Sequence, residues 1–472
     1  MSDVYVSPLV ARYAGRPMAR LFAPLERARA WRQVWIALAE AQQELGAPVT
    51  SAQVAALRET QGRIDLERIA QIEAVTRHDV MAHIQAWAEV CPEGAPILHL
   101  GATSCFVTDN ADALIQRRAL GGVRDRLVHL VRALADLAGR EADQPTLGYT
   151  HFQPAQPVTA GKRAALWLQD AVWDLEAVDA ELAGLRCRGA KGTTGTQASF
   201  LELLGDDGAV AELDRRVAAK LGFAGSVALS GQTSPRKLEA RLADALAGVG
   251  ITLGKLGRDV RLLCHTGELR EAFGEGQVGS SAMPYKRNPM RAERVCALAR
   301  SLLHLRTVVA ETAAVQWLER SLDDSAARRL AIPDLFLTCD GVLRAAVDLV
   351  GGLTVDAATA AARLRTEAPF LAVERLLVRG VLRGGDRQQL HEALRVHALE
   401  ARQAEDPGAD FLARVAGDAA FGLTADEAAA LAEPAALVGR APAQVRGYLA
   451  EVVEPLLERF REVPGANDPL TV

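Results

Sequence analysis

The clearest chemical potential lies at residues 279–289, which read Gly-Ser-Ser-Ala-Met-Pro-Tyr-Lys-Arg-Asn-Pro. Two adjacent hydroxyls, a lysine and an asparagine can together bind a carboxylate or a developing negative charge. Pro284 and Pro289 lack backbone donors and disfavour helix in the residues before them, which predicts a loop between two helical segments. A solvated turn is the plainer interpretation, but loops often carry function, so we expect an active-site loop.

Three glycines at this point, Gly274, Gly276 and Gly279, match the G-x-G-x-x-G pattern of dinucleotide-binding folds. That pattern requires a buried strand before it and a helix that opens on it. Residues 270–273 read Arg-Glu-Ala-Phe, which is too charged for a buried strand, and the proline-bearing loop follows. We therefore expect no dinucleotide-binding fold, and the glycines favour a mobile loop of the kind that closes active sites.

Arg77, His78 and Asp79 form a charged cluster at a probable helix start. Such a cluster can cap the helix or bind an anion at its N-terminus, and the sequence leaves both interpretations open. His78 and His83 are five residues apart, so they do not share a helix face as metal ligands at i and i+4 would. The sequence also lacks an H-E-x-x-H motif, and we expect no metal site.

Two further polar stretches stand where helices are expected to begin. At 101–104 a Gly-Ala-Thr-Ser turn precedes a helix, so Thr103 and Ser104 are either an ordinary cap or part of a seat for a carboxylate or phosphate. His151 lies in the proline-flanked stretch 150–157, which we interpret as a loop at a helix start.

Other stretches carry groups suited to anions. Residues 191–197 resemble a phosphate-cradling loop but lack the G-K-[ST] ending of a P-loop. Residues 316–329 predict a polar turn whose three arginines, Arg320, Arg328 and Arg329, suit a phosphate. Near the N-terminus, Arg12 and Tyr13 taken alone are a surface arginine beside a packing tyrosine.

The elements that must position these residues are helices. Alanine, leucine, arginine and glutamate dominate the 472 residues, and aromatic residues are only 5%. Apolar periodicity predicts a helix at about 26–45 and long helices at about 112–142, 158–185, 236–265 and 291–316. Helices of that length exceed the globular norm, which favours a bundle assembled with other chains.

Composition excludes several classes of protein. The net charge is −5, from 54 basic and 59 acidic side chains, so no global field attracts nucleic acid or a membrane. Six scattered cysteines without a C-x-x-C pair indicate reduced thiols, and the N-terminus lacks the features of a signal peptide. No apolar run approaches the roughly 18 residues of a membrane span, and we expect a cytoplasmic protein.

The recurring theme is anion recognition beside one histidine and one activated hydroxyl. A Ser-His-Asp hydrolase is disfavoured because G-x-S-x-G on a strand-to-helix turn is missing. Proton abstraction next to a carboxylate fits better, since the resulting dianion can be stabilised by donors placed in advance. Backbone N–H groups and a lysine can stabilise a serine oxyanion as the base, and a histidine can protonate the leaving amine or hydroxyl.

The 279–289 loop resembles the signature of the fumarase/aspartase superfamily, and within it the chain is similar to the adenylosuccinate lyase family, eukaryotic-type branch. Tyr285 stands where many bacterial members have histidine, and it matches that branch. The resemblance covers nearly the whole chain and is weakest after about residue 355. Its other support comes from Arg12-Tyr13 and from residues 76–81, 100–104, 150–156, 191–197 and 316–320.

This resemblance implies an all-α fold of three helical domains, at residues 1–110, 111–355 and 356–472, with a central long-helix bundle that assembles into a homotetramer. Active sites would lie where three chains meet. The implied activity is β-elimination of fumarate from adenylosuccinate to give AMP, and from SAICAR to give AICAR, in purine biosynthesis. The resemblance implies no metal and no organic cofactor.

The resemblance also implies roles for particular residues. Ser280 would be the base, and His151 the acid on the leaving nitrogen, oriented by Glu293. Lys286 and Asn288 would hold the carboxylate that becomes the aci-form, and His78 would assist in the substrate pocket. The positions that match binding residues for the nucleotide and succinyl groups are Arg12, Tyr13, Arg77, Asp79, Thr103, Ser104, Gln232, Arg294, Arg320, Ser325 and Arg329.

Two alternatives remain at this point. One is another lyase of the superfamily or a carboxymuconate-type cycloisomerase, which shares the loop but acts on small acids without a phosphate. The arginines at 316–329 would then have no partner. The other is a non-catalytic scaffold on the same fold, against which His151, Ser280 and Lys286 in polar loops argue.

Overall fold

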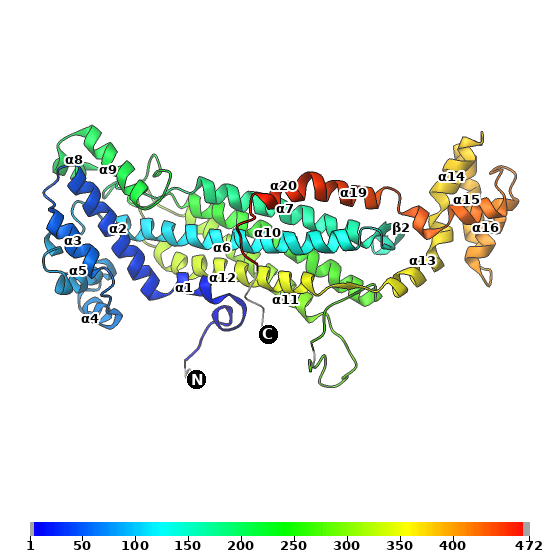
Figure 1. Ribbon diagram of the computed structural model, residues 1–472, viewed down its shortest axis with the longest axis horizontal. Helices are drawn as coiled ribbons and strands as arrows, with labels where there is room; N and C mark the ends of the chain where they lie inside the picture. Colours follow the sequence, from blue (N-terminus) through cyan, green and yellow to red (C-terminus); the bar gives the residue numbers. More distant parts are fainter. Residues whose placement is uncertain (1–3, 275, 466–472) are drawn as a thin grey trace.

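The computed structural model describes residues 4–274 and 276–465 and is elongated, with long helices side by side in the middle and shorter helices gathered at either end (Figure 1). Almost all of its regular structure is helical, which confirms the predicted all-α class. The division into domains at residues 110 and 355 stays a prediction. Among the described residues, no helix is both long and apolar enough to cross a bilayer.

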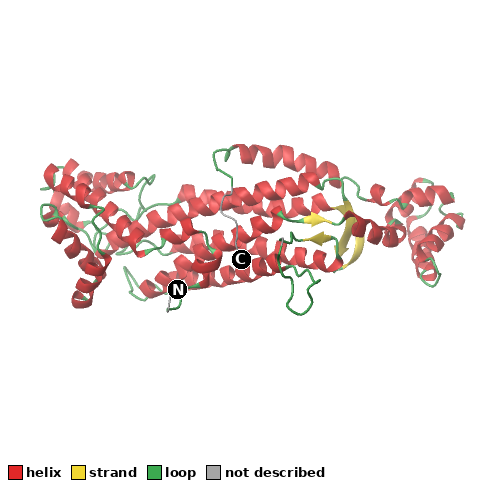
Figure 2. Ribbon diagram, turned by 60° about the horizontal axis from the view of Figure 1, so that its bottom comes forward, coloured by secondary structure: helices red, strands yellow, loops and turns green. Residues whose placement is uncertain are grey.

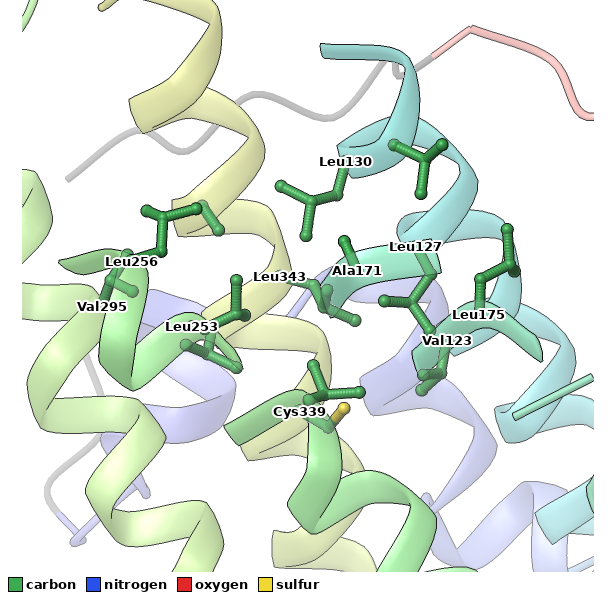
Figure 3. Close-up of a cluster of buried hydrophobic side chains, with 14 of the residues drawn as sticks. Val123, Leu127, Leu130, Ala171, Leu175, Leu253, Leu256, Val295, Cys339 and Leu343 are labelled. Atoms are coloured by element: carbon green, nitrogen blue, oxygen red, sulfur yellow. The ribbon is translucent and has the colours of Figure 1, made fainter. Parts of the chain in front are cut away.

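Five helices form the central bundle, and the sequence pattern predicted four of them. Their inward faces form one apolar core, to which α6 contributes Leu127 and α12 contributes Leu343 (Figure 3). The fifth, α12, contains Pro333 and begins inside the stretch that was predicted as a polar turn, so that prediction is wrong from residue 324 onward. The five helices are α6 Ser104–Arg140, α7 Ala160–Gly184, α10 Lys237–Thr266, α11 Met290–Ala314 and α12 Asp324–Gly351.

A second core lies at the end of the bundle where α6 begins. Trp35, Trp87, Phe106 and Phe200 are buried there, so helices from two separate parts of the chain share it. This half of the chain also contains two short helical turns, η1 Leu9–Tyr13 and η2 Ala95–Ile97. The helices that contribute buried residues to the second core include α2 Pro24–Glu44, α3 Ser51–Thr60, α5 Asp79–Val90, α8 Ala198–Leu204 and α9 Asp207–Lys220. Helix α1 (Arg16–Leu21) packs on the bundle core through Met18, and α4 (Leu66–Thr76) packs on α5 in a small separate cluster.

A third core lies at the opposite end, where Leu376, Phe411 and Phe421 are buried. The chain then returns along the bundle, and Val445 and Leu456 join the bundle core (Figure 1). The helices of the third core are α13 Ala357–Leu371, α14 Val373–Leu382, α15 Arg387–Ala401, α16 Pro407–Gly417, α17 Ala425–Leu431 and α18 Pro434–Leu437. The returning segment consists of α19 Ala441–Tyr448, η3 Leu449–Val453 and α20 Glu454–Glu458.

Two small antiparallel pairs of strands complete the described structure (Figure 2). Strand β1 (Pro145–Thr150) pairs with β2 (Gln153–Thr159), and β3 (Leu269–Arg270) pairs with β4 (Thr354–Val355). The loop predicted at 150–157 is therefore wrong, because this stretch is a β-hairpin. Prolines are tolerated in strands that lie at an edge, and both strands of a two-stranded ribbon are edges.

Candidate active site

A cavity of about 1110 Å³ lies between the N-terminal helices and the bundle. The first turns of three helices, α5, α6 and α12, contribute to its lining, and Arg236, the residue before α10, also lines it. Helix N-termini carry unpaired N–H groups and partial positive charge, so their convergence favours an anion. We call this cavity the anion pocket. The predicted site residues that line it are Arg77, His78, Asp79, Thr103, Ser104, Gln232, Arg320, Ser325 and Arg329.

Of the two roles that the sequence left open for this cluster, His78 fills the capping role. It is the N-cap of α5, and its Nδ1 accepts a hydrogen bond from the Met81 N–H at 3.3 Å. An imidazole that accepts at Nδ1 carries its proton at Nε2 when neutral. That Nε2 lies 3.5 Å from the Ser104 hydroxyl, so the capping bond fixes the ring with its other nitrogen beside the first turn of α6.

Thr103 occupies the N-cap position of α6, but its side chain makes no capping bond to the helix. Its hydroxyl instead accepts from the Gln232 amide at 3.4 Å. Of the two interpretations of the 101–104 turn, the ordinary side-chain cap is therefore not realised by Thr103. The first turn of α6 keeps polar groups available to a ligand in the pocket.

All three arginines of the 316–329 stretch line the pocket, and Arg320 and Arg329 are the more exposed of them. Arg329 pairs with Asp79 at 2.6 Å and is half exposed. Arg320 contacts the Cys105 sulfur and lies 3.8 Å from Asp324. Arg320 lies in the 315–323 loop, and Arg329 lies near the start of α12. Both cations are therefore beside the helix N-termini, where they can pair with a dianion.

The third arginine, Arg328, also lines the pocket, but its guanidinium is paired with carboxylates of the protein. It donates to Glu239 and Asp112, each at 2.8 Å. Burial alone would lower its pKa, but the two carboxylates raise that pKa well above the usual value. Because α12 is helical at these positions, Arg328 points inward and Arg329 points outward. The predicted turn gave no basis for distinguishing these two arginines.

A buried ion network ties the walls of the pocket together. Arg236 pairs with Asp109 of α6 at 3.1 Å and with Asp324 of α12 at 2.7 Å. Asp109 also accepts the Ser234 N–H at 2.6 Å. Burial raises the pKa of Asp109, but Arg236, Arg328 and the Ser234 N–H together outweigh this effect, so the pKa is lowered overall. Breaking such a pair would leave an unpaired buried charge, so the network fixes three helix starts relative to one another.

The remaining predicted residues lie elsewhere. His151 and Phe152 form the two-residue turn between β1 and β2, with φ of 53° and 57°. Such turns favour Asn-Gly, because a positive φ is energetically unfavourable for most non-glycine residues. An exposed histidine at a strained turn is typical of a functional position. Here the histidine lies on a β-hairpin and not on the predicted loop.

The 279–289 loop is folded back on itself as predicted for a loop. Ser280 Oγ accepts the Met283 N–H at 3.1 Å, and the Asn288 amide donates to the Gly279 carbonyl at 3.0 Å. A backbone N–H aimed at a hydroxyl oxygen favours its ionised form. Asn288 has a second N–H, so the bond within the loop leaves one donor for a ligand. Lys286 is exposed.

Four further candidates are placed outside the anion pocket. Glu293 and Arg294 lie in the first turn of α11, with Glu293 exposed. Arg12 and Tyr13 belong to η1, which packs on the middle of α12, where the Tyr13 carbonyl accepts from Arg344 at 2.6 Å. Within one chain these residues do not join the pocket.

Helices α2, α4 and α5, which contribute to the pocket lining, and strand β2, which follows His151, lie at opposite ends of the bundle (Figure 1). Helix α6 begins at the pocket and ends five residues before the hairpin, and its 37 residues span roughly 55 Å at 1.5 Å per residue. Helix α10 begins at the pocket and ends before the loop, and its 30 residues span about 45 Å. One chain therefore does not bring His151 or Ser280 to its own pocket.

Some pocket residues were not predicted as site residues. Arg27 and Trp31 come from α2, Glu73 from α4, and Leu322 from the 315–323 loop. Arg27 lies one turn before Trp31 on the same face of the helix predicted at about 26–45, and this spacing is the signal that could have drawn attention to it. In the described part of the chain, no group of three or more His, Cys, Asp or Glu side chains is arranged to hold a metal.

The fold and site together define a lyase of the fumarase/aspartase superfamily, since residues 20–302 match the family described as Lyase. Residues 369–448 match the family described as Adenylosuccinate lyase C-terminus. The chain belongs to the adenylosuccinate lyase family. It is 43% identical over 467 residues to adenylosuccinate lyase of Saccharomyces cerevisiae, covering 98% of this chain and 97% of that protein.

A second relative, adenylosuccinate lyase of Schistosoma mansoni, is 41% identical over 476 residues and covers 100% of this chain and 99% of that protein. The crystal structure of 3-carboxy-cis,cis-muconate lactonizing enzyme from Pseudomonas putida is similar in fold, with a TM-score of 0.81 and 26% identity. It covers 96% of this chain and 100% of that chain.

Proposed function

We propose that this chain is an adenylosuccinate lyase, which eliminates fumarate from adenylosuccinate to give AMP and from SAICAR to give AICAR. The anion pocket is the observation that carries this proposal, because both substrates bear a phosphate and two carboxylates. Arg320 and Arg329 stand there beside three helix N-termini. Similarity along the full chain to two adenylosuccinate lyases supports the same assignment.

In the proposed reaction, Ser280 takes a proton from the carbon next to the carboxylate that lies farther from the leaving nitrogen. The resulting aci-dianion is stabilised by Lys286 and by the second N–H of Asn288. The electron pair that proton removal left on the aci-form then forms the carbon–carbon double bond of fumarate. The carbon–nitrogen bond breaks with its electrons going to nitrogen, and His151 gives its proton to that nitrogen. The Met283 N–H on Ser280 Oγ supports the role of Ser280, because it stabilises the serine oxyanion.

In the anion pocket, Arg320, Ser325 and Arg329 would bind the phosphate, while Thr103 and Ser104 would bind a carboxylate. His78 would share that carboxylate through Nε2, which the capping bond leaves facing Ser104. Desolvated charge-assisted hydrogen bonds contribute on the order of 1.5–3 kcal/mol each, so a few such contacts supply most of a micromolar affinity.

The proposed chemistry requires proton transfer over hydrogen-bond distances, yet the pocket is separated from Ser280 and His151 by the length of α6 or α10. We therefore propose a homotetramer with shared active sites, in which the loop and the hairpin of other copies reach each pocket. In this assembly, the active site also includes Arg12, Tyr13, Glu293 and Arg294. Large apolar side chains exposed along the bundle support this assembly. They are Leu166, Trp173, Ile251, Leu262, Val308 and Leu330.

The proposed setting is the cytoplasm. All six cysteines are unpaired, and five of them are buried, as is usual where thiols stay reduced. The proposed partners are the two nucleotide substrates and further copies of this chain.

A cycloisomerase acting on a carboxymuconate is the second candidate, and the fold similarity to the lactonizing enzyme favours considering it. Such a substrate has no phosphate, so Arg320 and Arg329 would have no phosphate to bind. The purified protein should therefore be assayed spectrophotometrically on adenylosuccinate, SAICAR and 3-carboxy-cis,cis-muconate. Release of fumarate from the two nucleotides supports the proposal, whereas turnover of the muconate alone would overturn it.

A further inference from the structure

Two glutamates flank the two-residue strand β3, with Glu268 directly before it and Glu271 directly after it. We propose that both are positioning residues, Glu268 for the hairpin that carries His151 and Glu271 for the loop that carries Ser280. This inference deepens the proposed function and depends on it. The argument starts from what each carboxylate contacts.

Glu268 is 1% exposed and accepts three hydroxyl hydrogen bonds. Its Oε1 accepts from Thr146 at 2.8 Å, and its Oε2 accepts from Tyr149 at 2.7 Å and from Thr266 at 2.8 Å. Thr146 and Tyr149 belong to β1, whereas Thr266 ends α10. The carboxylate therefore fastens the hairpin to the end of a bundle helix through bonds that are buried and thus costly to lose.

The hairpin depends on such an anchor. Isolated two-stranded hairpins are marginally stable, and a turn with positive φ at both His151 and Phe152 adds strain that the surroundings must hold in place. Tyr149 transmits the anchor to the turn, because its ring packs against the Phe152 ring with centroids 5.6 Å apart. Glu268 thus fixes the backbone on which the imidazole stands.

Glu271 performs the same task for the loop by a different contact. Its two carboxylate oxygens accept the N–H groups of Arg291, at 3.0 Å, and Ala292, at 2.8 Å. These N–H groups belong to the first turn of α11, so the carboxylate caps that helix from the far side of the loop. The Arg291 guanidinium also donates to the Ala272 carbonyl at 2.6 Å.

The consequence is a loop closed at its base. The segment between Glu271 and Arg291 includes Ser280 and Lys286, and the carboxylate holds its two ends together. A closed base restricts the conformations of the loop and so the placement of the Ser280 hydroxyl. The four residues 268–271 therefore set the positions of both the proposed base and the proposed acid.

The test uses Glu268→Gln and Glu271→Gln in the full-length protein, with Gln156→Ala and Asp348→Asn as matched controls. Gln156 bonds the hairpin to Glu374 at an exposed site. Asp348 pairs with the Arg291 side chain at 2.8 Å without holding its N–H. We expect both glutamine variants to lower kcat by about 10- to 100-fold with KM changed less than about threefold, and the controls to stay near wild type.

Two readouts separate positioning from general support. The loss in kcat of Glu268→Gln should largely vanish in a His151→Ala background, because residues that act through one another are not additive. Trypsin should cleave after Lys286 or Arg287 faster in Glu271→Gln, but not in Glu268→Gln. Hydrogen exchange should rise in the hairpin of Glu268→Gln alone.

The inference is overturned if kcat is unchanged, if Glu268→Gln costs the same factor with and without His151, or if both variants lose protection throughout the chain. A wild-type protein that releases no fumarate would refute the proposed function instead. Hydrogen exchange and trypsin cleavage would then still decide whether the two glutamates hold the hairpin and the loop.

Discussion

The two ends of the bundle are built in different ways. At the anion pocket, Arg236 and its partners Asp109 and Asp324 have side chains at most 3% exposed, and three helices begin at fixed positions. At the opposite end, His151 and Lys286 are exposed on a strained hairpin turn and a loop. Binding of the anion therefore depends on rigid helix starts, whereas the proposed chemistry depends on segments that are held only at their bases.

This difference has a thermodynamic reason. A dianion is bound well by charges and dipoles that need no reorganisation, and buried ion pairs supply that rigidity. In the proposed assembly, the groups that enter the pocket of another chain need to project beyond the bundle, so they stay exposed in a single chain. We expect substitutions at the pocket to change affinity and substitutions at the opposite end to change kcat.

The largest effect is expected for Ser280→Ala. Loss of the base should lower kcat by about 10³- to 10⁴-fold, while the affinity for AMP changes less than threefold because the pocket is intact. Steady-state assays and equilibrium binding measure the two quantities. The neighbouring Ser281→Ala serves as the control, and a wild-type-like kcat in Ser280→Ala would refute the assignment of the base.

A smaller loss in kcat is expected for Gly279→Ala. A Cβ at this position would overlap the Lys286 carbonyl, so the loop cannot keep its fold. We expect kcat to fall by about 100-fold with a melting temperature within a few degrees of wild type, since the loop is exposed. At Gly274 a Cβ would make only ordinary contacts, so Gly274→Ala should be tolerated. Equal effects of the two substitutions would contradict the folded loop.

Arg329→Gln should affect binding at the anion pocket, which is the other end of the bundle. Removing one charge-assisted contact should weaken binding of AMP by about 10- to 100-fold while kcat at saturation changes less. The effect should shrink at high salt, because Arg329 is half exposed. Arg68→Gln, which breaks an exposed pair with Glu89, is the control. A change confined to kcat would argue against a role in binding.

The smallest effect on activity is expected in the bundle between the two ends, at Asp174. Burial raises the pKa of this carboxyl to about 7, from a usual value of 3.8. The folded state therefore holds a proton that the unfolded chain releases near pH 4, and stability falls as pH rises from about 4 to about 7.

Asp174→Asn should remove that pH dependence and raise the free energy of unfolding at pH 8 by a few kcal/mol. Denaturant titrations at pH 5 and pH 8 measure it, with the exposed Asp136→Asn as control. Turnover at pH 8 should stay near wild type. A stability difference between the two pH values that Asp174→Asn leaves unchanged would assign the pH dependence to other groups.

Much of this arrangement could be predicted from local sequence. The polar, proline-bearing loop at 279–289 was expected, as were helix starts near Asp79 and Ser104 and four of the five long helices, because period, capping and proline chemistry act over a few residues. The hairpin at His151 was missed, because its prolines argue against strands unless both strands are known to be edges.

Other features could not be predicted because they depend on distant partners. Arg328 resembles Arg329 in sequence, and only the helical phase and the carboxylates of Glu239 and Asp112 bury it. Asp109 carries no motif that identifies Arg236, 127 residues away, as its partner. The separation of the pocket from the loop follows from the direction of α6 and α10 in space, which periodicity does not give.

The most direct test of the central claim is subunit mixing. One variant carries Ser280→Ala, the other carries Arg320→Ala together with Arg329→Ala, and the two are mixed in equal amounts under conditions that exchange subunits. If pockets and loops from different chains form each site, random mixing leaves about a quarter of the sites intact, and activity should rise to about that fraction of wild type. Activity no greater than the mean of the two separate variants would contradict the account.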